Sequence, residues 1–274
     1  MRIFAHRPPH HRTTAPGLPR LLKTALASAL ALGTLIGLSG CDELGEILDG
    51  AQGGSSSSTA GAKLDGPKAT ATLEKLTVKG KAPASGYDRT RWFGKAWAYD
   101  YDGNGCRTRD DILARDMTNV KYAGGSKCKV ASGTLDDPYD GEVDSWKVGK
   151  NSVDIDHLVA LQNVWVSGAQ YWTGTAGQRQ RESIANDPLN LIAADASLNR
   201  TKGAANAAEW LPKNTGFRCQ YVATQISVKY KYQLSVTSAE KKAMQKILSG
   251  CSDQKAAKVA PLKIKTGRSV SLSK

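Results

Sequence analysis

The large aromatic residues and the cysteines of this chain are concentrated in one segment. All six tryptophans, from Trp92 to Trp210, and four of the five cysteines lie between Tyr87 and Cys251. A segment of about 170 residues is an ordinary size for a domain with its own core. We therefore expect one packed domain at residues 83–252, and the sequence shows no internal repeat.

The first forty residues have the composition of a secretory signal. Basic residues from Arg2 to Lys23 precede an apolar run from Thr24 to Gly37, and the first acid is Asp42. This run is too short for a comfortable membrane span, which needs roughly twenty residues. We expect residues 1–40 to direct export. Loss of their five basic residues lowers the net charge of the chain from +13 to +8.

The apolar run leads into Leu-Ser-Gly-Cys41, which resembles the lipobox of bacterial lipoproteins. The resemblance implies that Cys41 is lipidated and anchors the mature chain to the outer face of the cytoplasmic membrane. The alternative is ordinary cleavage and secretion, with Cys41 left as a spare thiol.

Two flanking segments have few large apolar residues. Residues 41–82 contain a Gly-Gly-Ser-Ser-Ser-Ser run that predicts a flexible tether, while a weak alternation from Lys68 to Lys81 predicts one edge strand. Residues 253–274 carry six basic side chains and the single acid Asp253. This composition predicts a disordered basic tail that can also hold an anionic polymer nonspecifically.

Once Cys41 is assigned to the lipid, an even number of cysteines remains, which in an exported protein predicts two disulfides. Four cysteines allow three connectivities. Sequence proximity favours Cys106 with Cys128 and Cys219 with Cys251, and each bridge is expected to stabilise the domain by about 3–4 kcal/mol. The alternative of four reduced thiols fits poorly with export.

The periodicity of the domain predicts an α+β fold with few strands. Strands are expected around Trp146, at Val153 and Ile155, and at residues 190–194. Helices are expected at residues 108–117, 158–166 and 197–210, in a stripe that contains Cys219 and Ile226, and after a capping box formed by Thr237 and Glu240.

The net positive charge of the mature chain favours an anionic partner, either a nucleic acid or an acidic polymer of the cell envelope. A composition of 40% hydrophobic and 23% charged residues describes a globular chain. Collagen, a coiled coil and a multi-span membrane protein are therefore excluded.

His157 is the only histidine beyond the signal segment. This excludes a multi-histidine zinc site, and the expected disulfides leave no free cysteine for Cys-His catalysis. A lone histidine is often structural. His157, however, follows Asp154 and Asp156 at the end of a strand-like alternation, which places a hard-metal ligand beside a general base.

A second polar motif follows His157 along the chain. Asn190 lies in Asn-Asp-Pro-Leu-Asn-Leu, and Asn199 opens Asn-Arg-Thr-Lys-Gly, which is followed by Ala-Glu-Trp-Leu-Pro. Together with Asp-His-Leu-Val-Ala-Leu, these motifs resemble the HNH endonuclease family. They are most similar to exported bacterial HNH proteins related to the C-terminal domain of the type IV restriction enzyme GmrSD. The resemblance covers residues 87–251 and implies a small ββα-metal finger embedded in a mostly helical single domain.

The resemblance also implies a role for each matching residue. His157 would be the general base that activates water, Asp156 and Asn199 would hold one divalent metal, and Asn190 would brace the finger and orient the histidine. Arg200 and Lys202 would contact the substrate phosphates, although each is equally compatible with a solvated basic helix face. The implied products carry a 3′-hydroxyl and a 5′-phosphate.

One position departs from a common pattern of the family. The third family position is often histidine, and here it is Asn199. Because an amide oxygen is a harder ligand than imidazole, we expect Mg²⁺, or Mn²⁺, in preference to Zn²⁺.

A second acidic cluster precedes the motifs. Asp100, Asp102, Asn104 and Asp111 occupy positions one, three, five and twelve of a loop with glycine at position six, as in calcium loops. Aspartate at position twelve and the neighbouring Cys106 weaken this similarity. We favour a glycine-rich turn and keep Ca²⁺ as the alternative. Arg107, Arg109 and Arg115, which lie nearby, could extend a phosphate-binding surface, but the sequence does not place them beside His157.

The sequence thus predicts a metal-dependent, weakly sequence-specific endonuclease that acts on nucleic acid, DNA in preference to RNA, outside the cytoplasmic membrane. No protein partner is inferred. The competing class is a non-catalytic lipoprotein that binds extracellular DNA or an anionic wall polymer. A metal hydrolase of the cell wall is a third hypothesis, and it explains Asn199, Arg200 and Lys202 less well.

Overall fold

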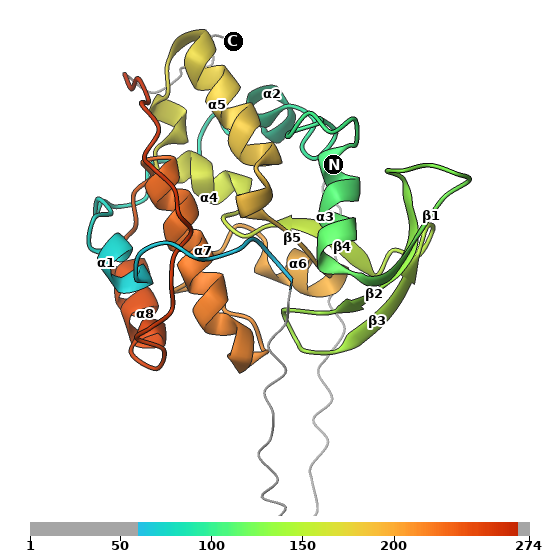
Figure 1. Cartoon of the computed structure of the whole chain (residues 1–274). Coiled ribbons are helices and arrows are strands. Elements are labelled where there is room, and N and C mark those ends of the chain that lie inside the picture. The colour runs from blue at the N-terminus through green and yellow to red at the C-terminus, as the bar shows by residue number, and fades with distance from the viewer. Residues whose placement is uncertain (1–59, 268–274) are drawn as a thin grey trace, which may run out of the picture. The chain divides into compact units, whose positions relative to one another are not determined.

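Both helices and strands build the fold, which is given by a computed structural model that describes residues 60–267. The strands are β1 (Thr118–Tyr122), β2 (Val130–Asp136), β3 (Val143–Lys147), β4 (Val153–His157) and β5 (Leu191–Asp195). The helices are α1 (Ala69–Leu73), α2 (Arg89–Phe93), α3 (Thr108–Asp116), α4 (Leu161–Val166), α5 (Gly174–Asn186), α6 (Ala196–Lys202), α7 (Arg218–Lys231) and α8 (Ser238–Leu248) (Figure 1). Short 3-10 helices span Ala169–Tyr171, Pro188–Asn190 and Thr215–Phe217.

The strands form two antiparallel sheets. One contains β1, β2 and β3 in that order, and the other pairs β4 with β5 so that His157 lies opposite Leu191. Helix α6 begins directly after β5, where the Asp195 side chain accepts a hydrogen bond of 2.7 Å from the Leu198 amide. β4, β5 and α6 therefore make a strand-strand-helix unit, with α4 and α5 inserted between its two strands.

Helix α6 is shorter than its sequence predicts. The expected helix ran to Trp210, but α6 ends at Lys202 and Gly203 adopts φ +51°. Glycine tolerates this left-handed conformation at low cost, which makes it a common helix terminator. The chain then turns away, so the residues after Gly203 lie outside the helix.

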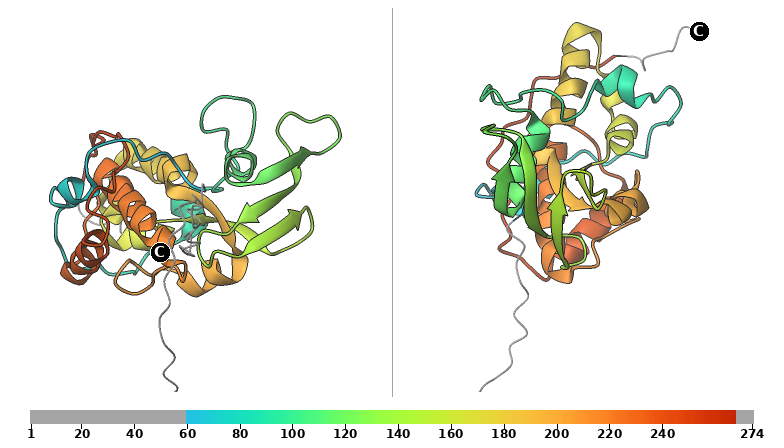
Figure 2. Two further views of the ribbon diagram at one scale, coloured as in Figure 1. Left: turned by 60° about the horizontal axis from the view of Figure 1, so that its bottom comes forward. Right: turned by 90° about the vertical axis from the view of Figure 1, so that its right-hand side faces the viewer.

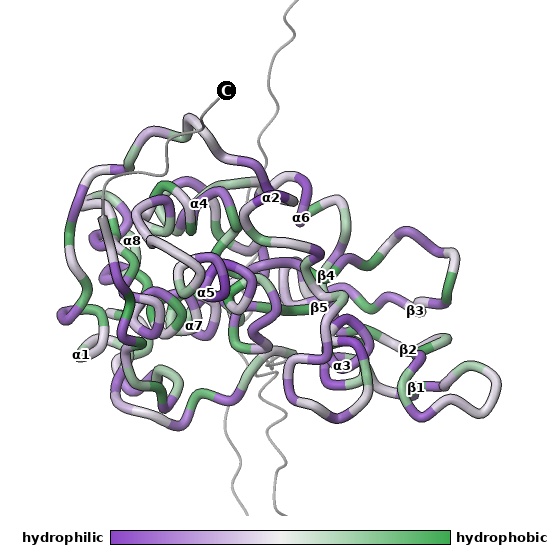
Figure 3. Tube along the Cα trace, turned by 90° about the horizontal axis from the view of Figure 1, so that it is seen from above, coloured by the Kyte–Doolittle hydropathy of each residue, from purple (hydrophilic) through white to green (hydrophobic). Residues whose placement is uncertain are grey.

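The core has three groups of buried hydrophobic side chains. Ile226 belongs to a group between α1, α7 and α8, whereas Trp165 and Trp172 belong to one among α2, α4 and α5. Ile112 and Ile155 represent the third, between α3, β2 and the β4-β5 pair. Figures 2 and 3 show β4 and β5 between the main group of helices and the β1-β3 sheet, with hydrophobic colouring along β5.

Both predicted disulfides are present, linking Cys106 to Cys128 and Cys219 to Cys251. The capping box of Thr237 and Glu240 also forms, at the start of α8. The bridge between Cys219 and Cys251 joins the first turn of α7 to the residues that follow α8. The prediction of an α+β single domain with two disulfides is confirmed.

The packed domain extends beyond the expected boundaries of 83 and 252. Residues 60–82, expected to belong to a tether, contribute Ala69 and Leu73 to the core. The expected strand at Lys68 to Lys81 is wrong, because α1 occupies its first part. Residues 253–267 of the expected disordered tail also pack, since Ala256 is fully buried and its carbonyl accepts a 2.8 Å hydrogen bond from the Gly66 amide.

Several predictions fall on residues outside the described range. These are the signal at residues 1–40, lipidation of Cys41, the first part of the tether and the end of the basic tail at residues 268–274. Within residues 60–267, the helices are too short or too polar to serve as membrane spans.

Candidate active site

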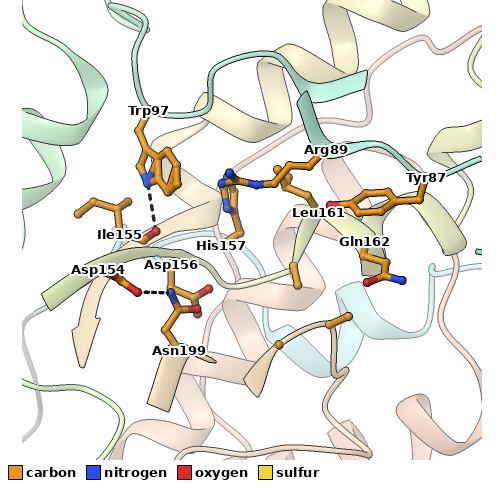
Figure 4. Close-up of a pocket in the computed structure, with 13 residues that line it drawn as sticks. Tyr87, Arg89, Trp97, Asp154, Ile155, Asp156, His157, Leu161, Gln162 and Asn199 are labelled. Atoms are coloured by element: carbon orange, nitrogen blue, oxygen red, sulfur yellow. Dashed lines mark hydrogen bonds between the residues drawn. The ribbon is translucent and has the colours of Figure 1, made fainter. Parts of the chain in front are cut away.

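His157 and Asn199, which come from motifs that are separate along the chain, line a common cavity of about 370 Å³, whereas Asn190, Arg200 and Lys202 do not line it. The cavity lies at the end of β4, where α6 and the loop before α2 meet (Figure 4). Its lining includes Tyr87, Arg89, Trp97, Asp154, Asp156, His157, Gln162 and Asn199. The family motifs therefore converge in space although they are separated along the chain.

Strand β4 sends its side chains to two opposite faces, as the twofold repeat of a strand requires. The imidazole of His157 lies on one side of the strand, beside Arg89 and Trp97 (Figure 4). The carboxylates of Asp154 and Asp156 lie on the other side, where α6 packs. The expected general base and the expected metal ligands thus reach the cavity from opposite faces of β4.

The His157 ring is held by one hydrogen bond and by ring packing. Its Nε2 lies 2.9 Å from the carbonyl oxygen of Ala185 in α5, and its ring centroid lies 5.7 Å from that of Trp97. Because a carbonyl can only accept, Nε2 carries the proton of the neutral ring. Nδ1 is then the nitrogen that can accept a proton.

Burial lowers the pKa of His157 to about 3, and the nearby positive charges of Arg89 and Lys202 act in the same direction. The hydrogen bond to Ala185 opposes this shift. The side chain is 5% exposed, so the loss of hydration of the charged form dominates. The imidazole is therefore neutral at physiological pH, which is the form that a general base requires.

The lowered pKa of His157 predicts acid-sensitive stability. Between pH 7 and pH 4 the unfolded chain takes up a proton on this imidazole and the native chain does not, so stability falls as the pH falls. We expect a loss of roughly 3 kcal/mol from this residue. Denaturant unfolding of wild type and His157→Gln in chelator should show this extra loss only in wild type. If the free energy of unfolding of the two proteins depended equally on pH, the lowered pKa of His157 would be contradicted.

Asp156 is buried in an ion pair. Its carboxylate lies 3.0 Å from the Lys202 ammonium and accepts a hydrogen bond from the Tyr139 hydroxyl. Tyr139 is itself fixed by edge packing against Trp210, with ring centroids 5.0 Å apart. Burial raises the pKa of Asp156, while Lys202 and Tyr139 oppose that shift. The carboxylate is therefore held rigidly at the base of the site.

Asn199 lies next to Asp156 but forms its side-chain hydrogen bond with Asp154 (Figure 4). Its Nδ2 donates a 3.1 Å hydrogen bond to the Asp154 carboxylate, and both side chains are partly exposed in the cavity. Asp154 was noted in the sequence but not assigned as a ligand. The structure makes it the direct partner of Asn199 and the more accessible of the two carboxylates.

Asn190 is fully buried and holds the chain just beyond His157. Its side chain accepts a 2.8 Å bond from the Val159 amide and donates to the Val159 carbonyl at 3.2 Å. This arrangement braces the end of β4 against the 3-10 helix at Pro188–Asn190. Ala185, and not Asn190, makes the hydrogen bond to the His157 ring.

The two expected phosphate ligands differ in position. Arg200 is exposed on α6. Lys202 is fully buried, because its ammonium lies against Asp156 and donates a 3.0 Å bond to the His157 carbonyl. Lys202 was expected to contact a substrate phosphate, but its charge is not exposed to solvent. Arg115 is also structural, since its guanidinium binds the carbonyls of Pro188 and Leu191.

Sequence reasoning missed Arg89 and Trp97. The Arg89 guanidinium stacks over the Trp97 ring at 4.6 Å and lies beside His157 (Figure 4). The Trp97 indole also donates a 3.0 Å bond to the Ile155 carbonyl, which ties it to β4. Neither residue belongs to a recognisable motif, so only the three-dimensional contact identifies them.

The acidic loop at Asp100 is organised by its own backbone. Asp100 accepts hydrogen bonds from the amides of Gly103, Asn104 and Gly105, as in a glycine-rich turn. Asn104 also donates a 3.2 Å bond to Asp111. These contacts are compatible with the turn that we favoured, and calcium binding stays a prediction.

Oxygen donors suited to a hard divalent cation gather on the α6 side of the cavity. They are the carboxylates of Asp154 and Asp156 and the side-chain amide of Asn199. No group of three or more His, Cys, Asp or Glu residues suited to a metal occurs in the described part of the chain. Carboxylate and amide oxygens are the ligand types that Mg²⁺ takes, and it keeps several waters and needs few protein oxygens. Both oxygens of Asp156 already accept hydrogen bonds from Lys202 and Tyr139, so Asp154 and Asn199 are the more available donors.

Comparison with known proteins identifies a similar family and one relative. The family described as the C-terminal domain of GmrSD restriction endonucleases matches residues 107–247. A protein of Arthroderma benhamiae (strain ATCC MYA-4681 / CBS 112371), described as an uncharacterized secreted protein, is 40% identical over 185 residues, which are 67% of this chain and 84% of the relative. No solved structure matches the chain.

Proposed function

Because the chain belongs to the family of GmrSD restriction endonuclease C-terminal domains, we propose that it is a metal-dependent HNH endonuclease. The β4-β5-α6 unit would be its ββα-metal finger. The observation that carries the proposal is the convergence of His157, Asp154, Asp156 and Asn199 on one cavity. A neutral imidazole and oxygen donors that line the same cavity are the groups that phosphodiester hydrolysis requires.

In the proposed reaction, Nδ1 of His157 accepts a proton from the attacking water. The oxygen of that water forms a bond to phosphorus as the bond to the 3′-oxygen breaks. The departing 3′-oxyanion takes a proton from solvent, so the products carry a 3′-hydroxyl and a 5′-phosphate. The Ala185 carbonyl keeps the ring in the tautomer that this step needs. The negative charge of a bound phosphate favours the imidazolium and so raises the low pKa of His157 toward the working range.

Asp156 and Asn199, together with Asp154, would hold the divalent cation. When bound, Mg²⁺ would supply positive charge that compensates the developing charge on the phosphate oxygens. Lys202 opposes the rise in the pKa of Asp156 that burial causes, and it fixes the orientation of the carboxylate. The Tyr139 hydroxyl also donates a hydrogen bond to the Asp156 carboxylate.

Arg89 is the proposed contact to the scissile phosphate on the imidazole side. Its side chain is exposed and its guanidinium lies next to the His157 ring, held there by stacking on Trp97. Arginine suits this role because its planar donors match phosphate oxygens. The phosphate would thus be bound between Arg89 on one face of β4 and the cation on the other.

We place this activity outside the cytoplasmic membrane. The two disulfides favour an oxidising compartment, and the relative from Arthroderma benhamiae is described as secreted. Lipidation of Cys41 would add a membrane anchor. Nucleic acid is the proposed substrate, with DNA preferred over RNA.

A cleavage assay of the purified protein tests the proposed function. Supercoiled plasmid and an RNA of similar length are incubated with Mg²⁺, with Mn²⁺ or with excess chelator. We expect the plasmid to be nicked and linearised with either metal and to remain intact with chelator. Salt-sensitive binding without turnover under all conditions would instead support the non-catalytic DNA-binding lipoprotein.

A further inference from the structure

A second pocket, rich in positive charge, lies beside the active-site cavity. Its volume is about 470 Å³, and it is formed by α3, the β2-β3 sheet, β4 and the second half of α6. We call it the basic pocket and define it by its cationic residues, Arg107, Arg109, Lys129, Lys150 and Arg200. Carboxylates in its lining come from Asp110 and Asp154.

Three of these cations are not neutralised by a carboxylate contact. Arg107 forms an ion pair with Asp110 at 2.8 Å, and Lys150 forms one with Asp144. Among the described residues 60–267, Arg109, Lys129 and Arg200 form no ion-pair contact, although the carboxylates of Asp110 and Asp154 attract Arg109 from a distance. The positive charge of Lys129 and Arg200 is therefore the part that most favours an anionic ligand.

The basic pocket adjoins the active site through shared and neighbouring residues. Asp154 lines both pockets, and Arg200 follows Asn199 directly on α6. Arg109 is positioned from the other side, since its guanidinium lies 5.8 Å from the Trp146 ring centroid and its amide donates to the Trp97 carbonyl at 3.1 Å. A polymer bound at His157 can therefore continue into the basic pocket.

We propose that the basic pocket binds the sugar-phosphate backbone of the nucleic acid strand beyond the scissile phosphate. This inference rests on the proposed function, because it extends the substrate of the same site. The ligand is a polynucleotide bound through its phosphates. Trp146 is 5% exposed and so offers no free face for base stacking, which predicts weak sequence preference.

Binding in chelator tests the proposal without requiring cleavage. Fluorescence anisotropy is measured with labelled duplex DNA and with single-stranded RNA across a range of salt concentrations. The test variant is Lys129→Gln/Arg200→Gln, which changes two exposed side chains. The matched control is Lys242→Gln/Lys246→Gln, which removes the same charge from exposed positions on α8.

We expect the pocket variant to bind roughly tenfold or more weakly and to lower the slope of log affinity against log salt by about two for duplex DNA. The α8 control should bind within about twofold of wild type. A larger effect with DNA than with RNA, or the reverse, identifies the preferred polymer. Thermal unfolding of both variants checks that they remain folded.

Two results would overturn the proposal. One is equal binding by the pocket variant and the α8 control. The other is tighter binding of inorganic polyphosphate than of either nucleic acid of similar charge. If wild type binds DNA through this pocket but does not cleave it with Mg²⁺, the proposed function fails while the basic pocket assignment stands.

Discussion

Replacing His157 with alanine is expected to lower the rate of plasmid cleavage by about 10²–10⁴-fold, the usual contribution of a general base. The variant removes the nitrogen that accepts the proton from water and leaves Asp154, Asp156 and Asn199 in place. The loss should therefore appear in kcat, with little change in DNA binding measured in chelator. Single-turnover cleavage with saturating protein measures the chemical step directly.

Two measurements separate a general base from a structural histidine. Added imidazole should restore part of the activity of His157→Ala, because the deleted ring leaves space beside the cavity. Gln162→Ala is the matched control, since Gln162 lines the same cavity without a role in the reaction. Cleavage by His157→Ala at the wild-type rate would remove the assignment of this residue.

Local signals explain which parts of the fold could be predicted. The capping box at Thr237, the alternation at Val153 and Ile155, and the short loops between paired cysteines are all encoded within short stretches. Structures of this kind depend on neighbouring residues, so spacing alone identifies them. The domain boundaries were harder to predict, because small residues such as Ala256 join the core only through contacts with residues that are distant in the sequence.

Helix α5 shows why other parts of the fold could not be predicted from the sequence. Its sequence is polar and contains Gly174 and Gly177, which disfavour a helix when read locally. In the fold, Gly177 permits a close approach, since a Cβ there would lie 2.5 Å from the Trp172 carbonyl carbon. The same helix supplies the Ala185 carbonyl that fixes the His157 ring. The orientation of the His157 ring thus depends on a packing contact that no motif reveals.

The sequence predicted which residues belong to the candidate site better than it predicted which of them form hydrogen bonds or ion pairs with one another. Asp156, His157 and Asn199 do line one cavity, as the motifs predict. The motifs could not indicate that Asn199 bonds to Asp154, or that Lys202 is buried on Asp156. These pairings are set by how α6 packs on β4, and that packing requires the structure. Arg89 enters from a segment with no motif at all.

Replacing Lys202 with methionine is expected to destabilise the fold by about 3–5 kcal/mol, because it leaves the Asp156 carboxylate buried without its counter-ion. The Lys202 side chain is fully buried, and that of Asp156 is 6% exposed. Without the ammonium, the pKa of Asp156 rises further, so the native chain resists ionisation of this group. The loss should therefore be larger at pH 8 than at pH 5, where the carboxyl is more readily protonated. Denaturant unfolding at both pH values measures the effect.

Two further variants show whether the loss comes from an unpaired buried charge. Asp156→Asn combined with Lys202→Met removes both charges, so it should recover much of the stability lost in the single variant. Lys150→Met breaks the more exposed pair with Asp144, whose side chains are 46% and 22% exposed, and should cost less than about 1 kcal/mol. A double variant as unstable as Lys202→Met would show that Lys202 stabilises the fold through packing and its bond to the His157 carbonyl. Recovery of stability without recovery of cleavage would instead identify Asp156 as a residue retained for the reaction, since its buried charge then serves the site more than the fold.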